Sequence, residues 1–284
     1  MTDLPAALVL GIIEGVTEFL PISSTGHLLV AERWLGHRSD LFNIAIQAGA
    51  ILAVVLIYWH RLWDLALGFF GHRAPAAHDP AGIALVPAQA RAYVFKLVGA
   101  FAVTAVLGIV VKKLGFELPE TVTPVAWALV LGGVWMLAAE HFAAHRAAVL
   151  GERATITWTV AFLVGVAQVV AGVFPGTSRS AATIFVALLF GVTNRAAATE
   201  FAFLVGIPTM FAATAYELLD VYKAGGLAGE DWTALAVAFV AATVTAFVAV
   251  KWLLRYIQTH RFTLFAFYRI ALGAALLLLV PTGA

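Results

Sequence analysis

The chain alternates apolar runs of 10 to 20 residues with short clusters of charge, glycine and proline. The runs cover Pro5–Leu20, Leu41–Trp59, Ala92–Val111, Pro124–Ala139, Ile156–Phe174, Ala181–Phe190, Glu200–Leu219, Trp232–Val250 and Phe262–Leu279. A helix needs about 20 apolar residues to cross a hydrocarbon core of about 30 Å. The pattern predicts an all-α integral membrane protein with six transmembrane helices, together with two segments that break before they cross.

The two broken segments each end in a proline and a polar cluster. Pro5–Leu20 would span only roughly 24 Å as a helix, contains two glutamates, and leads into PISSTGH. Ile156–Phe174 leads into FPGTSRS, where Pro175 and Gly176 interrupt the helix. We therefore expect both segments to enter the membrane and turn back as re-entrant helical hairpins.

These two segments also resemble each other in sequence. A shift of 154 positions aligns Gly11 with Gly165, Glu14 with Gln168, Pro21 with Pro175, Ser23 with Thr177 and Ser24 with Ser178. One hairpin plus three spans crosses the membrane an odd number of times, so the second copy should be inverted relative to the first. The prediction is a single membrane domain, 1–284, with repeats over about 5–140 and 155–284.

Composition supports this class and removes several functions. Hydrophobic residues make up 62% of the chain and charged residues 12%, whereas soluble domains carry about 25% charged residues. The net charge of +1 provides no field for nucleic acid. The chain has no cysteine, which excludes disulfides, thiolate metal sites and thiol nucleophiles.

Loop charges predict the orientation in the membrane. Connections 60–91, 140–155 and 251–263 carry eight Lys and Arg residues, while the opposite connections mix three lysines with acidic residues. Positively charged loops tend to remain in the cytoplasm. Both termini and the first hairpin are thus expected on the outer side.

Glu14 and Glu18 are the first candidates for chemistry. Four positions apart on a helix, their carboxylates lie about 5–6 Å from each other on one face. Two such charges inside a membrane are costly unless a cation bridges them or one takes a proton. Paired carboxylates suit a hard divalent ion such as Mg²⁺. The alternative is that both line a solvated cavity mouth.

The polar clusters at the two breaks are candidates for binding an anion. Ser23, Ser24 and Thr25 stand where a new half-helix exposes backbone N–H groups, which can bind an anion or be capped by the hydroxyls. The second cluster contains Thr177, Ser178, Arg179 and Ser180. The planar guanidinium of an arginine suits phosphate, and a buried arginine needs an anionic partner.

If the hairpins meet, carboxylates, hydroxyls and a guanidinium converge, as phosphoryl chemistry requires. His27 lies three residues beyond Ser24 and could act as its base, although a lone histidine is more often a packing residue. Gln168 is expected to point into the same cavity. Three further charges are expected to have non-catalytic roles: Arg269 should snorkel to the cytoplasmic end of its span, and Glu200 and Glu217 should be interfacial.

The segments EGVTEFLPISSTGHL and PGTSRSAAT resemble the two signature regions of the bacterial undecaprenyl-diphosphatases, the bacitracin-resistance type of integral membrane phosphatase. The similarity continues in NIAIQAGAILAVV, EFAFLVGIPTM and FAFYR. In one departure, Ala181 follows Ser180 where the family usually has glycine; this adds a methyl group and removes no chemical group.

The resemblance implies removal of the terminal phosphate from a C55 polyprenyl diphosphate at the outer, periplasmic face of the bacterial inner membrane. It implies a dependence on Mg²⁺ or Ca²⁺ and assigns site roles to Glu14, Glu18, Ser24, His27 and Arg179. The resemblance leaves open whether Ser24, His27 or water attacks phosphorus. It also leaves open whether the protein forms a homo-oligomer. The rival interpretation is a transporter or lipid flippase, because inverted repeats with half-helices facing a central site also describe transporters.

Overall fold

The computed structural model describes residues 3–72, 86–115, 121–225 and 229–280. Within those ranges the chain forms eleven helices and no strands, which confirms the all-α prediction. The helices are α1 (Leu4–Thr17), α2 (Ser24–Leu35), α3 (Asp40–Ile57), α4 (Trp59–Phe69), α5 (Pro87–Lys113), α6 (Val122–Leu150), α7 (Trp158–Val173), α8 (Arg179–Leu189), α9 (Arg195–Lys223), α10 (Trp232–Thr259) and α11 (Thr263–Leu279).

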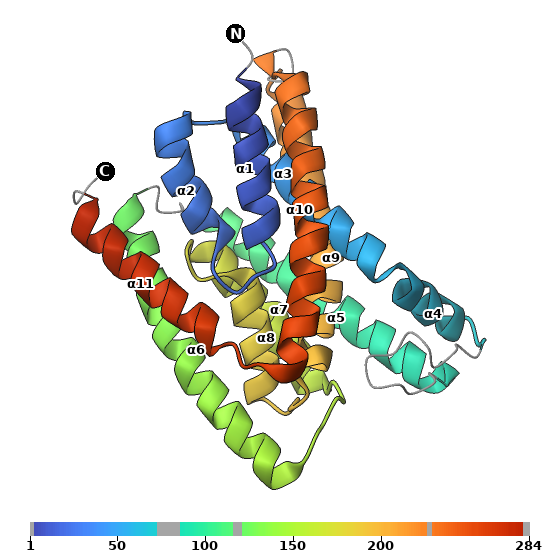
Figure 1. The fold of residues 1–284 in the computed structure, drawn as a ribbon. Coiled ribbons are helices and arrows are strands. Elements are labelled where there is room, and N and C mark those ends of the chain that lie inside the picture. Colours follow the sequence, from blue (N-terminus) through green and yellow to red (C-terminus); the bar gives the residue numbers. More distant parts are fainter. Residues whose placement is uncertain (1–2, 73–85, 116–120, 226–228, 281–284) are drawn as a thin grey trace.

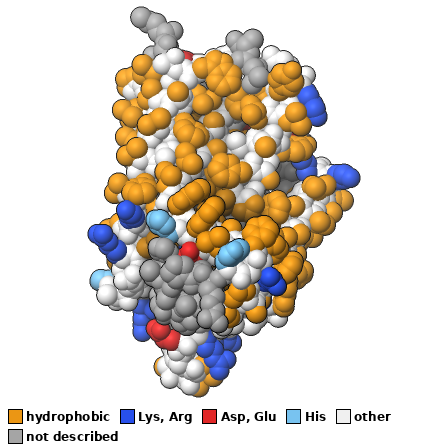
Figure 2. Space-filling model, turned by 90° about the vertical axis from the view of Figure 1, so that its right-hand side faces the viewer, with side chains coloured by type: hydrophobic (Ala, Val, Ile, Leu, Met, Phe, Trp, Pro, Cys, Tyr) orange, Lys and Arg blue, Asp and Glu red, His pale blue; other side chains and the backbone are white. Residues whose placement is uncertain are grey.

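Five of the described helices are long and apolar enough to cross a membrane: α3, α5, α6, α9 and α10. The sixth expected span, α11, is an apolar helix of 17 residues, about 25 Å long. Hydrophobic side chains cover most of the upper part of the face in Figure 2, and Lys, Arg and His side chains gather mainly below them. Such a surface suits lipid contact, and the chain is a multi-pass membrane protein.

Two helix pairs break within the bundle, at the two predicted positions. The first hairpin is α1 and α2, joined by residues 18–23, and the second hairpin is α7 and α8, joined by residues 174–178. Ser23 and Ser178 cap α2 and α8, and both have positive φ, 74° and 69°, although neither is a glycine. The caps are 155 positions apart rather than 154, because Ser23 follows Gly11 by 12 residues, whereas Ser178 follows Gly165 by 13 residues.

Close helix contacts hold each hairpin against a long span. A Cβ atom at Gly11 of α1 would lie 2.3 Å from the carbonyl oxygen of Ala238 in α10. A Cβ atom at Gly165 of α7 would lie 2.6 Å from the carbonyl oxygen of Ala100 in α5. Small residues let helix backbones approach closely in membranes. The spans α10 and α5 therefore fix the first and second hairpins respectively (Figure 1).

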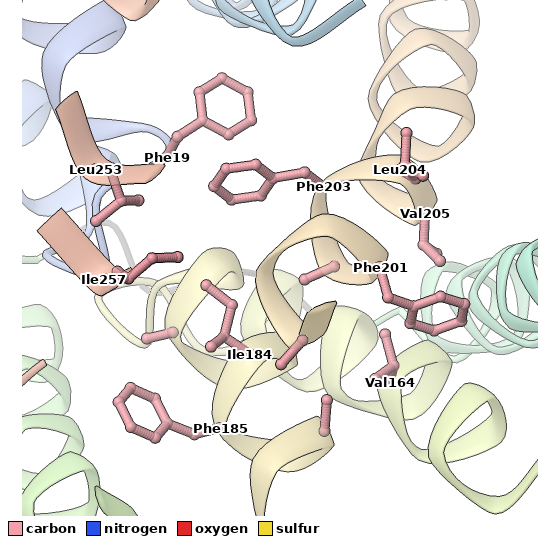
Figure 3. Close-up of a cluster of buried hydrophobic side chains, with 14 of the residues drawn as sticks. Phe19, Val164, Ile184, Phe185, Phe201, Phe203, Leu204, Val205, Leu253 and Ile257 are labelled. Atoms are coloured by element: carbon pink, nitrogen blue, oxygen red, sulfur yellow. The ribbon is translucent and has the colours of Figure 1, made fainter. Parts of the chain in front are cut away.

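The main hydrophobic core joins the hairpins to each other. Figure 3 shows Phe19, from the first loop, beside Phe203 of α9, with ring centroids 5.1 Å apart. Ile184 and Phe185 of α8 are fully buried in the same cluster, together with residues of α10. Because one core contacts both hairpins, their loops are held at fixed positions relative to each other.

Glu200, which is expected to be interfacial, is covered by neighbouring helices. Its side chain is only 3% exposed, and Oε1 lies 3.0 Å from Nε of Arg61 in α4 and 3.2 Å from the hydroxyl of Tyr93 in α5. The position near a helix start is as expected, but α4 and α5 cover it. This ion pair ties three helices together.

Candidate active site

The two hairpins meet at Glu18 and Arg179. Arg179 is the first residue of α8, and its Nη2 donates to Oε1 of Glu18 at 2.6 Å. The hydroxyl of Ser24, the first residue of α2, donates to Oε2 of the same carboxylate at 2.5 Å. The side chain of Glu18 is 6% exposed and that of Arg179 is 26% exposed. The structure thus links an acid, a hydroxyl and a guanidinium from two distant parts of the sequence.

Glu14 lies one helical turn before Glu18 and is fully buried. Neither of its carboxylate oxygens has a hydrogen-bond partner among the described residues. A buried carboxylate without a partner requires either a proton or a cation.

Glu14 and Glu18 fit a hard divalent ion, provided that water and substrate supply the rest of its ligands. Among the described residues, no group of three or more His, Cys, Asp or Glu side chains could hold a metal. Glu14 and Glu18 would supply two carboxylates, and the remaining oxygens would come from water and substrate. This is the usual coordination of Mg²⁺, which keeps several waters and binds substrate phosphates.

The hydroxyl residues at the breaks mostly organise the loops. Ser23 accepts a hydrogen bond from the backbone N–H of Gly26, which caps α2. Ser178 caps α8 and lies 3.1 Å from the hydroxyl of Ser180, which itself donates to the carbonyl oxygen of Leu20 in the first loop. The last bond is a second direct link between the hairpins.

The other three predicted residues, Thr25, Thr177 and Gln168, do not take part in these hydrogen bonds. Thr25 is exposed, and the backbone carbonyl of Thr177 accepts from a buried arginine. Gln168 is buried, and its Nε2 donates to the hydroxyl of Thr104 in α5 at 3.0 Å. No contact described in the structure joins Gln168 to Glu18 or Arg179.

The interpretation of Arg269 as a snorkelling residue is wrong. Its side chain, on α11, is completely buried. Nη1 donates to the carbonyl oxygens of Thr177 at 2.9 Å and Pro21 at 3.4 Å, and Nη2 donates to those of Gly176 at 2.9 Å and Ala128 at 3.2 Å. Because α11 packs against α6 with this residue turned inward, the guanidinium reaches both loops instead of the membrane surface.

Arg269 therefore clamps the two breaks together. The residue before it, Tyr268, also contacts the site: its hydroxyl lies 2.7 Å from Nε2 of His27. The sequence pattern does not single out Tyr268. Its neighbour Arg269 did offer a signal, because an ionisable residue inside an apolar run is a functional candidate by default.

This arrangement can bind and transfer a phosphoryl group. Arg179 and the starts of α2 and α8 offer donors for phosphate oxygens, and Ser24 offers a hydroxyl already bonded to a carboxylate. Positioning and charge neutralisation supply most of the catalysis in such reactions. Fold and site together define a multi-pass membrane protein suited to phosphoryl chemistry.

Comparison with known proteins gives the family. A model of the family described as bacitracin resistance protein BacA matches residues 7–275, and the chain belongs to this family. An undecaprenyl-diphosphatase of Rhizobium etli is 65% identical over 277 residues, which is 98% of this chain and 97% of that protein. An undecaprenyl-diphosphatase of Xanthomonas euvesicatoria pv. vesicatoria is 62% identical over 284 residues, the full length of both chains.

Proposed function

We infer that this chain hydrolyses undecaprenyl diphosphate to undecaprenyl phosphate and inorganic phosphate, and so recycles the lipid carrier of cell-wall synthesis. The names and high identity of its full-length relatives support this function. The structural observation that carries it is the Arg179–Glu18–Ser24 chain of hydrogen bonds across the two hairpins. A flippase or transporter would need a binding site there but no activated hydroxyl.

We propose that the chain crosses the membrane six times and that its halves form an inverted repeat. Contacts between α6 and α11 support this arrangement. A Cβ atom at Gly133 would lie 2.8 Å from the carbonyl oxygen of Ala266, and one at Gly273 would lie 2.7 Å from that of Ala126. A shift of 140 positions relates Gly133 to Gly273 and Ala126 to Ala266 (273 − 133 and 266 − 126). Exchanging the two halves therefore turns one contact into the other, as a twofold axis requires.

We propose that the site faces the periplasm from the inner membrane. The first hairpin enters from the side of the membrane whose loops mix acidic and basic residues, while eight Lys and Arg residues occupy the loops of the other side. The positive-inside rule places the basic loops in the cytoplasm. The diphosphate would then reach the site from the outer leaflet.

Ser24 is proposed to be the nucleophile. In the free protein Arg179 pairs with Glu18; when the diphosphate arrives, the guanidinium turns to its oxygens and frees one oxygen of the carboxylate. Ser24 then attacks the terminal phosphorus, its proton passes to Glu18, and the bond to the bridging oxygen breaks. Undecaprenyl phosphate leaves and a phosphoserine remains.

Water completes the reaction. His27, one helical turn after Ser24, takes a proton from a water molecule whose oxygen attacks the phosphoserine. The bond between phosphorus and the Ser24 oxygen breaks, and Glu18 returns its proton to that oxygen. His27 gives the proton that it took from water to the departing inorganic phosphate, and the free enzyme is restored.

Glu14 and Glu18 are the proposed ligands of Mg²⁺ or Ca²⁺. A bound divalent ion would screen the negative charge of the diphosphate and stabilise the charge that develops on it. Full burial of Glu14 and its lack of a hydrogen-bond partner among the described residues support this assignment. Without a cation, these carboxylates would repel the substrate.

The test is phosphate release from undecaprenyl diphosphate by purified protein in detergent, which transport alone cannot produce. Arg179→Ala should lower kcat/KM at least a hundredfold, because the phosphate loses a bidentate donor. Arg195→Ala is the matched control. Its ion pair with Glu140 has the same 26% exposure on the arginine side chain, but it lies outside the two breaks. Full turnover by a folded Arg179→Ala protein would contradict the proposal.

A further inference from the structure

The hydrogen bonds of His27 determine which of its ring nitrogens carries the proton. Nδ1 lies 2.7 Å from the backbone carbonyl oxygen of Ser23. A carbonyl oxygen can only accept, so Nδ1 must be the donor and must carry a hydrogen. In the neutral imidazole, Nε2 therefore has the free lone pair.

Tyr268 occupies that lone pair. Its hydroxyl lies 2.7 Å from Nε2, and the two rings are almost parallel, at 6°, with centroids 5.7 Å apart. The hydroxyl donates to neutral Nε2 and can accept from a protonated Nε2–H without moving. One geometry thus serves both protonation states of His27.

The position of Tyr268 is itself fixed. The next residue, Arg269, is held by carbonyl oxygens of both loops and of α6, so the backbone of α11 cannot shift here without breaking those bonds. Adjacent helix residues point in directions about 100° apart. Arg269 therefore points toward the loops while Tyr268 points toward α2.

We propose that Tyr268 positions His27 and relays the proton to it: its hydroxyl holds His27 in the tautomer protonated on Nδ1, and it donates its own hydrogen to Nε2 as its oxygen accepts the hydrogen of the attacking water. This inference rests on the proposed function. No other described group is within hydrogen-bonding distance of Nε2. Tyr268 is 44% exposed, so this side of the imidazole is open at the protein surface.

The described hydrogen bonds of His27 come from two segments. The carbonyl oxygen of Ser23, just before α2, binds Nδ1, and Tyr268 of α11 binds Nε2. The residue before His27, Gly26, faces the apolar side chains of Val125 and Leu129 in α6.

Tyr268→Phe tests the proposal because it keeps the ring and removes only the hydroxyl. We expect kcat to fall about tenfold with little change in KM, a fraction of the 10²–10⁴ that a general acid–base group contributes. The apparent melting temperature should stay within about 1 °C, since a half-exposed hydroxyl can be replaced by water. Tyr256→Phe is the matched control, because Tyr256 stacks on a different histidine, His260, with ring centroids 4.7 Å apart, and no described contact joins it to His27.

Two further measurements separate positioning from a structural effect. In a His27→Ala background, Tyr268→Phe should cause no additional loss of kcat. The ¹⁵N spectrum of histidine-labelled protein should show His27 as a single Nδ1–H tautomer, and Tyr268→Phe should give a mixture of tautomers. Wild-type kcat in Tyr268→Phe, or an equal loss in the His27→Ala background, would overturn the inference. If wild-type protein released no phosphate, the proposed function would fail instead, while the NMR result would still test the tautomer.

Discussion

Gly132 of α6 lies directly behind the guanidinium of Arg269. A Cβ atom there would come 2.2 Å from Nη2 and 2.9 Å from Cζ. Ordinary contacts of a Cβ begin at 3.4 Å, so Nη2 would have to move by about 1.2 Å (3.4 − 2.2). Unlike most arginine ends, this guanidinium cannot swing aside, because carbonyl oxygens surround it.

The expected cost of Gly132→Ala follows from the bonds that this shift breaks. Nη2 donates to Gly176 and Ala128, and bonds from a charged donor contribute roughly 1.5–3 kcal/mol each, so their loss costs about 3–6 kcal/mol. Replacing glycine by alanine inside a helix stabilises the helix by about 1 kcal/mol, which offsets part of this loss. The net destabilisation should be about 2–5 kcal/mol. We also expect kcat to fall more than tenfold, because a misplacement of about 1 Å at a site can cost 10²-fold.

Denaturation in detergent and phosphate release would measure both effects. Gly108→Ala in α5 is the control, since a Cβ at this position meets no atom within 4 Å. The substitution gives the same gain in helix propensity without a steric clash. In an Arg269→Met background, Gly132→Ala should cost nothing further. Wild-type stability and turnover in Gly132→Ala would refute the view that Arg269 is a rigid clamp between the loops.

Two more predictions concern the metal and the orientation. Treatment with a chelator should abolish phosphate release, and added Mg²⁺ or Ca²⁺ should restore it; activity that survives exhaustive chelation would contradict the assignment of Glu14 and Glu18 as ligands. Because the chain contains no cysteine, single cysteines can report sidedness. Ala224→Cys should react with an impermeant maleimide in spheroplasts, and Glu152→Cys only after the membrane is opened; the reverse pattern would invert the proposed topology.

Features set by neighbouring residues were predictable from the sequence. Proline and glycine stop a helix locally, and serine caps the next one, so the caps Ser23 and Ser178 belong to the expected hydroxyl clusters. The second break begins one residue before the expected place, after Val173, and the first begins three residues before it, after Thr17. The pairing of Glu18 with Arg179 was also foreseeable, because an unpaired charge at either position would be costly. Both arguments need only the order of residues and the cost of burial.

Features set by helix rotation were not predictable. Hydropathy gives the approximate depth of Arg269 and Glu200, but it does not tell which neighbouring helix each side chain faces. Arg269 faces the loops only because α11 packs on α6, and Glu200 is covered only because α4 and α5 close over it. The hydrogen bond from Gln168 of α7 to Thr104 of α5 likewise depends on how these two helices face each other.

The clamp by Arg269 also bears on how the protein is made. Membrane proteins are inserted from the N-terminus as they are synthesised, and Arg269 belongs to the final helix. Until that helix enters the bilayer, the carbonyl oxygens of Pro21, Gly176 and Thr177 lack their shared donor. A growing chain can thus hold all of its acidic and hydroxyl groups in the membrane and still be inactive, so the last helix inserted would complete the enzyme.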